Sequence, residues 1–297
     1  MLTHTPAPNN VRWWQIFNPA IYLISILPAI AVIVLAGENP VWHEGLIAST
    51  LAVVLLQHAI NLFNDVSDWK LGADTEKMDS WVRVHNGNTR PVTIHALISF
   101  FLGGIIGLSV LMIGDKLWIV FFALPLIALG YLYNAGKSPL SYSWMGEWVT
   151  GICYGPGVFG GLWFVAGQDF NLTAISGMLA FAALAVSLLL SHQPPQIETD
   201  RLAGKKSFCV RYGKQKTCQV SVWLFTAALL LFAAGLSINH NIPYLQISAF
   251  SLVLIFSLYL SKVEPNPKRV LLLSSTLLLL SVTALPWLAF SKQVPVS

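Results

Sequence analysis

The chain has 297 residues, of which 55% are hydrophobic and only 10% are Asp, Glu, Lys or Arg, and its formal net charge is +4. Soluble globular domains carry roughly 25% charged residues, so this chain has too few charges to cover the surface of a water-soluble protein of its size. The composition excludes an ordinary soluble enzyme, a disordered protein and a disulfide-stapled secreted domain, and the small net charge gives little support to nucleic-acid binding. Three cysteines without a CxxC spacing indicate neither a disulfide framework nor a zinc site. We therefore predict an all-α integral membrane protein.

A helix needs about 20 mostly apolar residues to cross the hydrocarbon core of a bilayer. Nine stretches meet this requirement, at about residues 19–36, 43–65, 92–114, 116–134, 146–166, 171–193, 217–238, 243–261 and 269–291. Residues 1–18 precede the first stretch and contain Arg12, Trp13 and Trp14, a combination typical of the membrane interface. We predict nine transmembrane helices over residues 19–291, an interfacial N-terminal segment over residues 1–18 and a short C-terminal tail over residues 292–297.

Basic residues are distributed unevenly between the two sides that nine crossings define. If the N-terminus is inside, 15 of the 17 Lys and Arg residues lie on the inner side, and only Lys116 and Lys292 lie outside. The positive-inside rule therefore predicts a cytoplasmic N-terminus in a multi-pass protein of the inner membrane. Two inner loops, residues 65–91 and 194–216, contain 17 of the 30 charges. We expect the chemistry to take place at this cytoplasmic rim.

The end of the second predicted span carries a polar stripe. At about 100° per residue, a helix places Gln57, Asn61, Asn64 and Asp68 within about 60° of one another, with Asp65 at the border. Such a stripe is costly in a membrane unless it faces a cavity or a partner. Oxygen ligands at positions i and i+4 suit Mg²⁺, which binds through one or two carboxylates plus substrate phosphates. The alternative interpretation is that the amides bond between helices and the aspartates belong to a solvated loop.

The second polar segment follows the sixth predicted span. Gln196 and Asp200 are at positions i and i+4 if this segment is helical, whereas Pro194 and Pro195 are expected to end the span and could start a new helical turn. Residues suited to phosphate contacts come next, namely Lys205, Lys206 and Arg211. The alternative is a positively charged inner loop that binds no ligand. Together, the two segments predict a diphosphate bridged by Mg²⁺ whose organic part lies in the membrane, as a prenyl diphosphate would.

Here the chain resembles the UbiA superfamily of intramembrane aromatic prenyltransferases over most of its length. The segments that carry the resemblance are Asn61 with Asn64-Asp65-x-x-Asp68 and Asp74, residues 197–206 with 210–213, and residues 133–142 with Gly146-Glu147. The first two resemble the two Asp motifs of the superfamily. The third resembles the menaquinone branch, the 1,4-dihydroxy-2-naphthoate polyprenyltransferases.

The resemblance implies nine helices around a central cavity and Mg²⁺-dependent transfer of a polyprenyl group from its diphosphate to an aromatic acceptor, 1,4-dihydroxy-2-naphthoate in menaquinone biosynthesis. Metal ligands are expected at Asn64, Asp68, Gln196 and Asp200. Substrate contacts are expected at Gln57, Asn61, Arg90, Tyr142, Lys205, Lys206 and Arg211. Catalytic roles are expected for Asp65, Asp68, Asp200 and Tyr133. The expected partners are the two substrates and the lipid bilayer, without nucleic acid or an obligate protein partner.

The expected catalytic roles are stabilisation of the prenyl carbocation and removal of a proton by a general base. Aromatic faces stabilise cations in desolvated sites, so Tyr131, Tyr133 and Tyr142 are candidates for facing the prenyl carbocation. The alternative for these tyrosines is the aromatic belt at the membrane interface. Asp65 is a candidate general base. Gly151 and Gly155 predict close helix packing, and a glycine-lined prenyl channel is the alternative.

One departure from the branch pattern concerns the second motif. The branch has an Asn pair and an Asp where this chain has His192-Gln193 and Gln196. Glu198 could supply the missing charge, or a second ion could bind weakly, or the acceptor could differ. Prenylation of a 4-hydroxybenzoate or homogentisate type of acceptor, a degenerate binding homologue and a membrane transporter are the competing functions.

Overall fold

The computed structural model describes residues 19–72, 80–134, 136, 138–239 and 243–292, and this part of the chain folds into helices without any β-strand. The N-terminal elements are η1 (Pro19–Tyr22), α2 (Leu23–Ala36), α3 (His43–Leu71), α4 (Trp81–Val84), α5 (Thr89–Ile113) and α6 (Trp118–Asn134). The central elements are η2 (Leu140–Tyr142), α7 (Gly146–Ile152), the π-helical η3 (Cys153–Gly160), α8 (Gly161–Val165) and α9 (Leu172–Leu202). The C-terminal elements are α10 (Phe208–Tyr212), α11 (Lys214–Asn239), α12 (Pro243–Lys262) and α13 (Pro267–Lys292).

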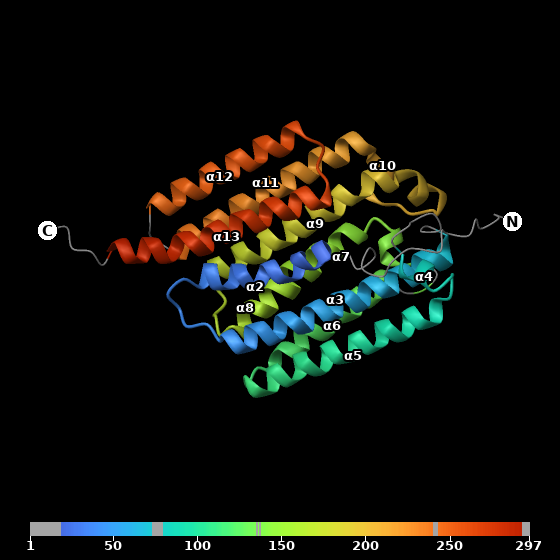
Figure 1. Cartoon of the computed structure of the whole chain (residues 1–297), viewed down its shortest axis with the longest axis horizontal. Coiled ribbons are helices and arrows are strands. Elements are labelled where there is room, and N and C mark those ends of the chain that lie inside the picture. Colours follow the sequence, from blue (N-terminus) through green and yellow to red (C-terminus); the bar gives the residue numbers. More distant parts are fainter. Residues whose placement is uncertain (1–18, 73–79, 135, 137, 240–242, 293–297) are drawn as a thin grey trace.

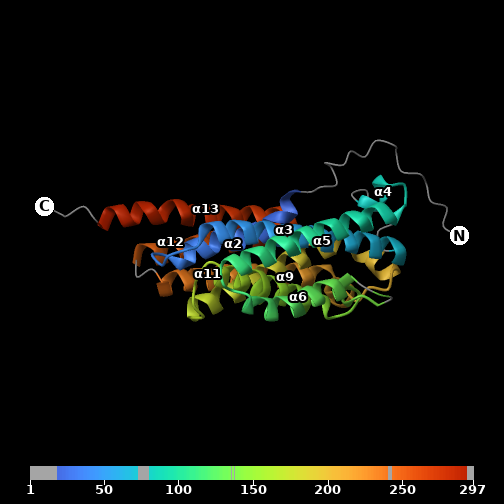
Figure 2. The same ribbon diagram turned by 90° about the horizontal axis from the view of Figure 1, so that it is seen from below.

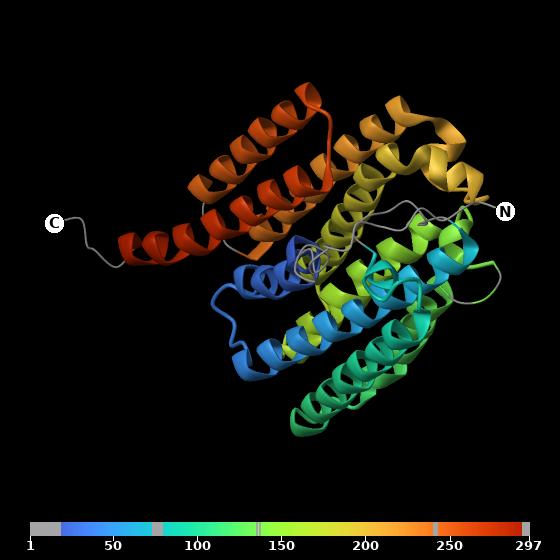
Figure 3. The same ribbon diagram turned by 45° about the vertical axis from the view of Figure 1, so that its right-hand side comes forward.

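The helices form one elongated bundle. Figure 1 shows α3, α5 and α6 along one side and α11, α12 and α13 along the other, with α2 and α9 between them. Figure 2 shows α13 and α6 on opposite faces of the bundle, and Figure 3 shows α2 between the two sides. The most extensive helix pairs are α9 with α11 and α3 with α5.

Helical segments occur at each of the nine predicted spans. Five of them are long and apolar enough to cross a membrane, namely His43–Leu71, Thr89–Ile113, Gly146–Val165, Leu172–Leu202 and Lys214–Ile238. Shorter apolar helices include Leu23–Ala36, Trp118–Asn134 and Ser251–Lys262. The chain is therefore a multi-pass membrane protein, whereas nine crossings and a cytoplasmic N-terminus stay predictions. The predicted segment 1–18 and residues 293–297 of the predicted tail lie outside the described residues.

Helix α3 is longer than its predicted span. It continues to Leu71 and ends at Gly72, whose φ of 83° is the left-handed conformation that favours glycine at a helix end. The backbone N–H of Gly72 is bonded to the carbonyls of Asp68 and Trp69. The first Asp motif therefore lies on a regular helix, in its last two turns, rather than in a loop.

Helix α9 corrects the expectation for the two prolines. Pro194 and Pro195 lie inside a single helix that runs from Leu172 to Leu202, so they do not end it. Each proline removes one helical hydrogen bond, but membrane helices tolerate this loss where neighbouring elements support the backbone. Here α7, α10 and α11 all pack against α9. The consequence is that the second Asp motif is carried by the same rigid helix as the membrane-embedded residues before it.

The segment from Gly146 to Val165 packs closely on α9. A side-chain carbon added at Gly155 would lie 2.8 Å from the Cβ atom of Ala182, and one added at Gly151 would lie 3.3 Å from Val186. Both glycines therefore allow close packing, as predicted. Gly155 belongs to the wide π-helical turn η3, which packs against α9, α2 and α6, and turns of this type are often found at functional sites.

Helices α4 and α10 lie at the same end of the bundle, as Figure 1 shows. They belong to the two charged loops that follow α3 and α9. The fold thus brings together the two Asp motifs, which are more than a hundred residues apart in sequence. We refer to this part of the molecule as the α4/α10 end.

Candidate active site

Asp68 is the centre of the polar cluster at the α4/α10 end. Its side chain is almost completely buried, and three donors surround it. The Tyr142 hydroxyl donates to Oδ1 at 2.8 Å, whereas the Asn64 amide and the Lys205 ammonium donate to Oδ2 at 2.9 and 3.1 Å. Hydrogen bonds from a charged donor such as Lys205 to a carboxylate are among the stronger ones in proteins, so these contacts fix the orientation of the Asp68 side chain.

Lys205 joins the two Asp motifs. Its Nζ lies 3.1 Å from Asp68 Oδ2 and 3.6 Å from Asp200 Oδ1, and the three side chains are at most 14% exposed. Asp200 Oδ2 also accepts a hydrogen bond from the Ser207 hydroxyl at 3.2 Å. The Lys205 ammonium lies 4.8 Å from the centre of the Tyr142 ring. We call these two carboxylates and the ammonium between them the Asp68–Lys205–Asp200 cluster.

Two neighbouring cavities lie between the helices and share part of their walls, and we refer to them together as the joined cavity. One has a volume of about 190 Å³ and the other of about 240 Å³. The residues that line both are Gln57, Ile60, Asn61, Gly130, Cys153 and Tyr154. Both cavities have mainly apolar walls. Tyr133, Thr150 and His192 line only the first, which we call the polar half, whereas most of the residues that line only the second, the apolar half, are hydrophobic.

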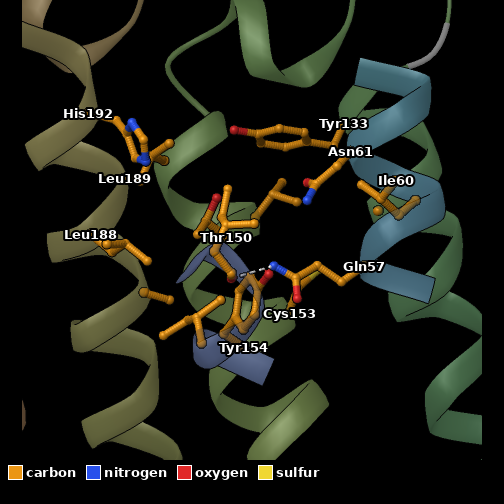
Figure 4. A pocket seen from close by; sticks show the side chains of 15 residues that line it. Gln57, Ile60, Asn61, Tyr133, Thr150, Cys153, Tyr154, Leu188, Leu189 and His192 are labelled. Carbon is orange, nitrogen blue, oxygen red and sulfur yellow. Dashed lines mark hydrogen bonds between the residues drawn. The ribbon is translucent and has the colours of Figure 1, made fainter. Parts of the chain in front are cut away.

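Figure 4 shows the polar half of this cavity. Gln57 and Asn61 come from α3, Tyr133 from α6 and His192 from α9, on the opposite wall. The Tyr133 side chain is hydrogen-bonded to that of Thr150. Gln57 and Asn61 of the α3 stripe therefore border the same cavity as His192 of α9.

The apolar half extends between α3, α5 and α6. Its additional walls are formed by Ser25, Val53, Leu56, Phe100, Ala123, Leu126, Ile127, Gly157 and Val158. Gly157 belongs to the glycine-rich segment, so this segment both packs on α9 and borders the cavity. Close packing on α9 therefore concerns Gly151 and Gly155, whereas Gly157 is the glycine of this segment that lines the cavity.

The residues of the α3 stripe have different contacts along the helix. Gln57 holds α2 and η1 in place, because its Oε1 accepts from the Ser25 hydroxyl at 2.6 Å and its Nε2 donates to the Ile21 carbonyl at 3.0 Å. Asn61 lies one turn further on, in the wall of both cavities. Asn64 directs its amide nitrogen at Asp68, which leaves its amide oxygen on the same face.

Asp65 lies apart from the cluster. Its Oδ2 accepts from the backbone N–H of Trp81 at 2.9 Å, so it holds the first residue of α4. It is not among the residues that line the joined cavity in the described part of the chain. Its predicted role as a general base therefore stays a prediction.

The three tyrosines have different environments. Tyr133 lines the cavity and Tyr142 is bonded to Asp68. Tyr131 is 55% exposed and packs edge-on against Phe63 at a ring distance of 6.3 Å, as expected for a residue of the interfacial belt. Tyr133 therefore borders the cavity and Tyr142 borders the cluster, whereas a role facing the substrate stays a prediction for both.

The predicted phosphate contacts are only partly assembled. Lys205 is in the cluster, and Arg211 is paired with Glu147 at 3.4 Å. The Lys206 side chain is exposed, although its backbone N–H donates to the Tyr142 carbonyl. Arg90 is exposed near the start of α5, and no described contact joins it to the cluster.

Glu147 is a site residue whose role the sequence did not reveal. It accepts from the backbone N–H of Phe208 at 2.7 Å and from the Gln193 amide at 3.2 Å, in addition to Arg211. It thereby fastens α10 and the basic residues beside it to α7 and α9. The available signal was an isolated carboxylate at the start of an apolar span, where a buried charge needs partners.

Glu198 does not supply the charge that Gln196 lacks. Its side chain is 73% exposed and pairs with Arg201 at 2.9 Å, on the outer side of α9. Gln196 is half-buried and lies one turn before Asp200 on α9. Two of the three explanations for the altered motif therefore remain, namely a weakly bound second ion or a different acceptor.

The donor set fits Mg²⁺ only in its usual role beside phosphate. In the described part of the chain, no group of three or more His, Cys, Asp or Glu side chains could hold a metal ion. Asp68, Asp200 and the free amide oxygen of Asn64 are hard oxygen donors, and Mg²⁺ usually takes its other ligands from water and substrate phosphates. The residues therefore fit such an ion, and do not form an all-protein metal cage. Asp74 of the first motif lies outside the described residues.

The sequence pattern of the UbiA prenyltransferase family matches residues 25–280 of this chain. The chain belongs to the UbiA prenyltransferase family. The matched range contains the whole Asp68–Lys205–Asp200 cluster and the joined cavity. The chain is accordingly an enzyme, a prenyltransferase, as the two Asp motifs predicted.

Two characterised relatives act on naphthoate-type substrates by name. The chain is 28% identical to the 2-carboxy-1,4-naphthoquinone phytyltransferase of Synechocystis sp. over 82% of this chain and 80% of that protein. It is 27% identical to the 1,4-dihydroxy-2-naphthoate octaprenyltransferase of Bacillus subtilis over 76% of this chain and 73% of that protein. These relatives belong to the branch that residues 133–142 resemble.

Solved structures of UbiA homologues share the fold. The homologue from Archaeoglobus fulgidus, bound to DMAPP and Mg²⁺, aligns with a TM-score of 0.66 at 13% identity and covers 93% of this chain and 99% of its own. The homologue from Aeropyrum pernix aligns with a TM-score of 0.65 at 16% identity, with the same shares of the two chains covered. The helical bundle is therefore the fold of the UbiA prenyltransferase family.

Proposed function

We propose that this UbiA family enzyme transfers a polyprenyl group from polyprenyl diphosphate to 1,4-dihydroxy-2-naphthoate, with Mg²⁺ as cofactor, in menaquinone biosynthesis. The observation that carries the proposal is the Asp68–Lys205–Asp200 cluster, in which the two Asp motifs meet, together with a mainly apolar cavity that Gln57 and Asn61 of the same α3 stripe border. The naphthoate substrates of the relatives support the choice of acceptor.

The proposed division of labour follows the polarity of the site. Asn64, Asp68 and Asp200 would hold Mg²⁺ together with the diphosphate, with Gln196 as an uncharged fourth ligand. When bound, Mg²⁺ neutralises the negative charge that accumulates on the departing diphosphate. Lys205 adds a positive charge in the same buried place, where electrostatic stabilisation is strong because water is excluded. Lys206 and Arg211 lie next in the chain and would extend this positive surface.

The reacting carbon atoms meet in the joined cavity. The allylic C–O bond breaks, and the electron pair leaves with the diphosphate. A C–C bond then forms at the ring carbon that carries the carboxylate, and this carboxylate leaves as carbon dioxide, so no further reactant is needed. Tyr133 faces the cavity where the allylic cation develops, and aromatic faces stabilise cations by about 2 kcal/mol when desolvated.

A transporter is disfavoured by the placement of charge. Transporters place ionisable groups near the middle of the bilayer, on broken helices. In the described part of the chain, no Asp, Glu, Lys or Arg lines either half of the joined cavity. The carboxylates gather instead at the α4/α10 end. We propose that this end faces the cytoplasm in an inner membrane, that the chain crosses it nine times and that residues 19–291 form one domain.

The decisive experiment is a transfer assay in isolated membranes with labelled polyprenyl diphosphate. The acceptors are 1,4-dihydroxy-2-naphthoate, 4-hydroxybenzoate and homogentisate, each with Mg²⁺ and with EDTA. The proposal expects a prenylated naphthoate product that disappears with EDTA. Product formed only with another acceptor would overturn the choice of acceptor, and donor binding without product would indicate a degenerate homologue.

A further inference from the structure

A cleft separate from the joined cavity lies between α11 and α12. Its volume is about 490 Å³, and in the described part of the chain no residue lines both it and the joined cavity. One wall is formed by α11 between Lys214 and Trp223, and the other by residues 260–265, where α12 ends and the connection to α13 begins. Figure 1 shows α12 at the edge of the bundle beside α11. This α11/α12 cleft therefore lies at the perimeter, where a membrane protein meets lipid.

The α11 wall of the cleft changes from polar to apolar along the helix. Its residues recur at a spacing of four, which places them on one side of α11. Those in the first two turns are Lys214, Gln215, Cys218 and Gln219, and those in the third turn are Val222 and Trp223. Trp223 is 69% exposed and lies about 13 Å along the axis from Lys214. Because tryptophan prefers the membrane interface, the mouth of the cleft belongs at the level of the lipid head groups.

Basic residues outnumber acidic residues around the cleft. Residues 208–223 and 260–269 contain six Lys or Arg residues and a single carboxylate, Glu264. Lys214 and Lys262 line the cleft and are exposed, and neither forms an ion pair with another described residue. Lys205, in contrast, is held between two carboxylates. The cleft thus offers two ammonium groups to an anionic ligand.

The wall opposite α11 is held in shape by its own hydrogen bonds. The Arg269 guanidinium donates to the Glu264 carbonyl at 2.6 Å, and the Asn266 side chain accepts from the Arg269 backbone N–H at 3.0 Å. These bonds fix the connection between α12 and α13 against the first turn of α13. Both walls of the cleft are therefore formed by ordered backbone.

We propose that the α11/α12 cleft binds the head group of an anionic phospholipid, with Lys214 and Lys262 at its phosphate and Trp223 beside the start of its acyl chains. Basic pockets between transmembrane helices attract anionic head groups, and the volume is typical of small-molecule sites. Two ammonium groups against one carboxylate favour an anionic over a zwitterionic lipid. The apolar third turn of α11 and the position at the perimeter favour a lipid over a soluble phosphate.

The test uses the full-length protein in detergent, titrated with phosphatidylglycerol or phosphatidylcholine and followed by native mass spectrometry. The variants are Lys214→Gln, Lys262→Gln and the matched control Lys70→Gln, an exposed lysine at the end of α3. Each cleft variant should bind phosphatidylglycerol about fivefold more weakly, the factor expected for one basic residue near an anionic lipid. The control should bind it like the wild type, and phosphatidylcholine should bind more weakly than phosphatidylglycerol to the wild type.

Glu264→Gln provides a prediction of opposite sign. Removing the one carboxylate that lines the described cleft should strengthen the binding of phosphatidylglycerol by a similar factor. A disturbed fold does not produce such an increase. Weaker binding in this variant would overturn the choice of an anionic lipid, because the carboxylate would then hold the ammonium of a zwitterionic head group.

The remaining outcomes distinguish the phospholipid from other phosphates. Equal loss in Lys70→Gln and in the cleft variants would overturn the site, because overall charge would then decide binding. Displacement of phosphatidylglycerol by an equal concentration of glycerol phosphate would overturn the requirement for a lipid. The KM for polyprenyl diphosphate, measured without added phospholipid, should be the same in Lys214→Gln, Lys262→Gln and the wild type. A raised KM would assign the cleft to the substrate diphosphate instead.

Discussion

Two polar stripes face each other across the cavity, one on α3 and one on α9, and they differ in composition. The α3 stripe consists of the amides Gln57, Asn61 and Asn64 and ends in a single carboxylate, Asp68. The α9 stripe consists of His192, Gln196 and Asp200. Each stripe supplies one buried carboxylate at the α4/α10 end, and a single ammonium on the α9 side links them.

The two stripes also differ in their surroundings: the α3 side chains are bonded to neighbouring residues, whereas basic residues follow the α9 stripe. The α3 stripe is fixed by its own neighbours, because Gln57 is bonded to α2 and η1 and Asn64 is bonded to Asp68. The α9 stripe is followed directly by the cations of the site, and the backbone N–H of Lys205 is bonded to the Asp200 carbonyl through a turn at Gly204. We infer that α3 provides a preformed wall and that α9 provides the charges that respond to the diphosphate.

The largest expected loss of activity follows from neutralising the carboxylate of each stripe. Asp68→Asn and Asp200→Asn should each lower prenyl transfer at least about 100-fold, because even outer partners of metal ligands typically cost about 10- to 100-fold when they are removed. Glu198→Gln is the matched control, an exposed carboxylate on α9 between Gln196 and Asp200. Initial rates in membranes with equal protein content measure the effect.

An equal loss in Glu198→Gln and Asp200→Asn would contradict this assignment. It would mean that negative charge anywhere on the end of α9 suffices. Retained activity in Asp68→Asn would show that the first motif does not hold the cation.

The second prediction removes the link between the stripes. Lys205→Met should raise the KM for polyprenyl diphosphate about 10- to 100-fold, since hydrogen bonds to charged groups contribute about 1.5–3 kcal/mol. It should also leave two buried carboxylates without their shared counter-ion, which is destabilising in the absence of ligand. Lys262→Met is the control, because Lys262 is an exposed lysine at the end of α12 and has no expected contact with substrate. Lys205→Arg, which keeps the charge, should restore most of the stability in a thermal unfolding assay.

The third prediction concerns a variant in which the α9 stripe has two carboxylates instead of one. Gln196→Asp adds a charge one turn before Asp200 and should lower the Mg²⁺ concentration for half-maximal activity about tenfold, because affinity for hard cations rises with the number of charged ligands. Gln215→Asp, an exposed position near the start of α11, adds the same charge elsewhere. Mg²⁺ titrations of both variants distinguish a local ligand from a general charge effect, and identical curves would argue against Gln196 as a ligand position.

The two stripes also show what could be predicted from the sequence. The α3 stripe followed from helical periodicity, because polar residues at spacings of three and four recur on one side of an uninterrupted helix. The α9 stripe was not predicted as part of one helix, because Pro194 and Pro195 would end most helices in water. Neighbouring helices hold this helix together instead, and that support is a property of the tertiary packing.

For a related reason, the sequence could not predict which side chains form ion pairs and hydrogen bonds with one another. Lys205 was expected to contact phosphate, but sequence distance alone cannot show that it lies between Asp68 and Asp200. The same holds for Glu147, whose partners come from α9 and α10. Residue type predicted the chemistry of the site, whereas the partners depended on which helix ends meet at the α4/α10 end.

The smallest expected effect concerns the apolar half of the cavity, where neither stripe carries a charge. Leu126 lines this half from α6, whereas Leu124 on the same helix is 60% exposed on the outside of the bundle. Leu126→Trp should reduce the space for the prenyl chain and lower the ratio of rates for long over short donors by a factor of about 3 to 10, a size typical of steric discrimination in an apolar pocket. Leu124→Trp should leave this ratio unchanged. Competition between farnesyl and longer polyprenyl diphosphates measures it, and an equal shift in both variants would place the prenyl chain outside this cavity.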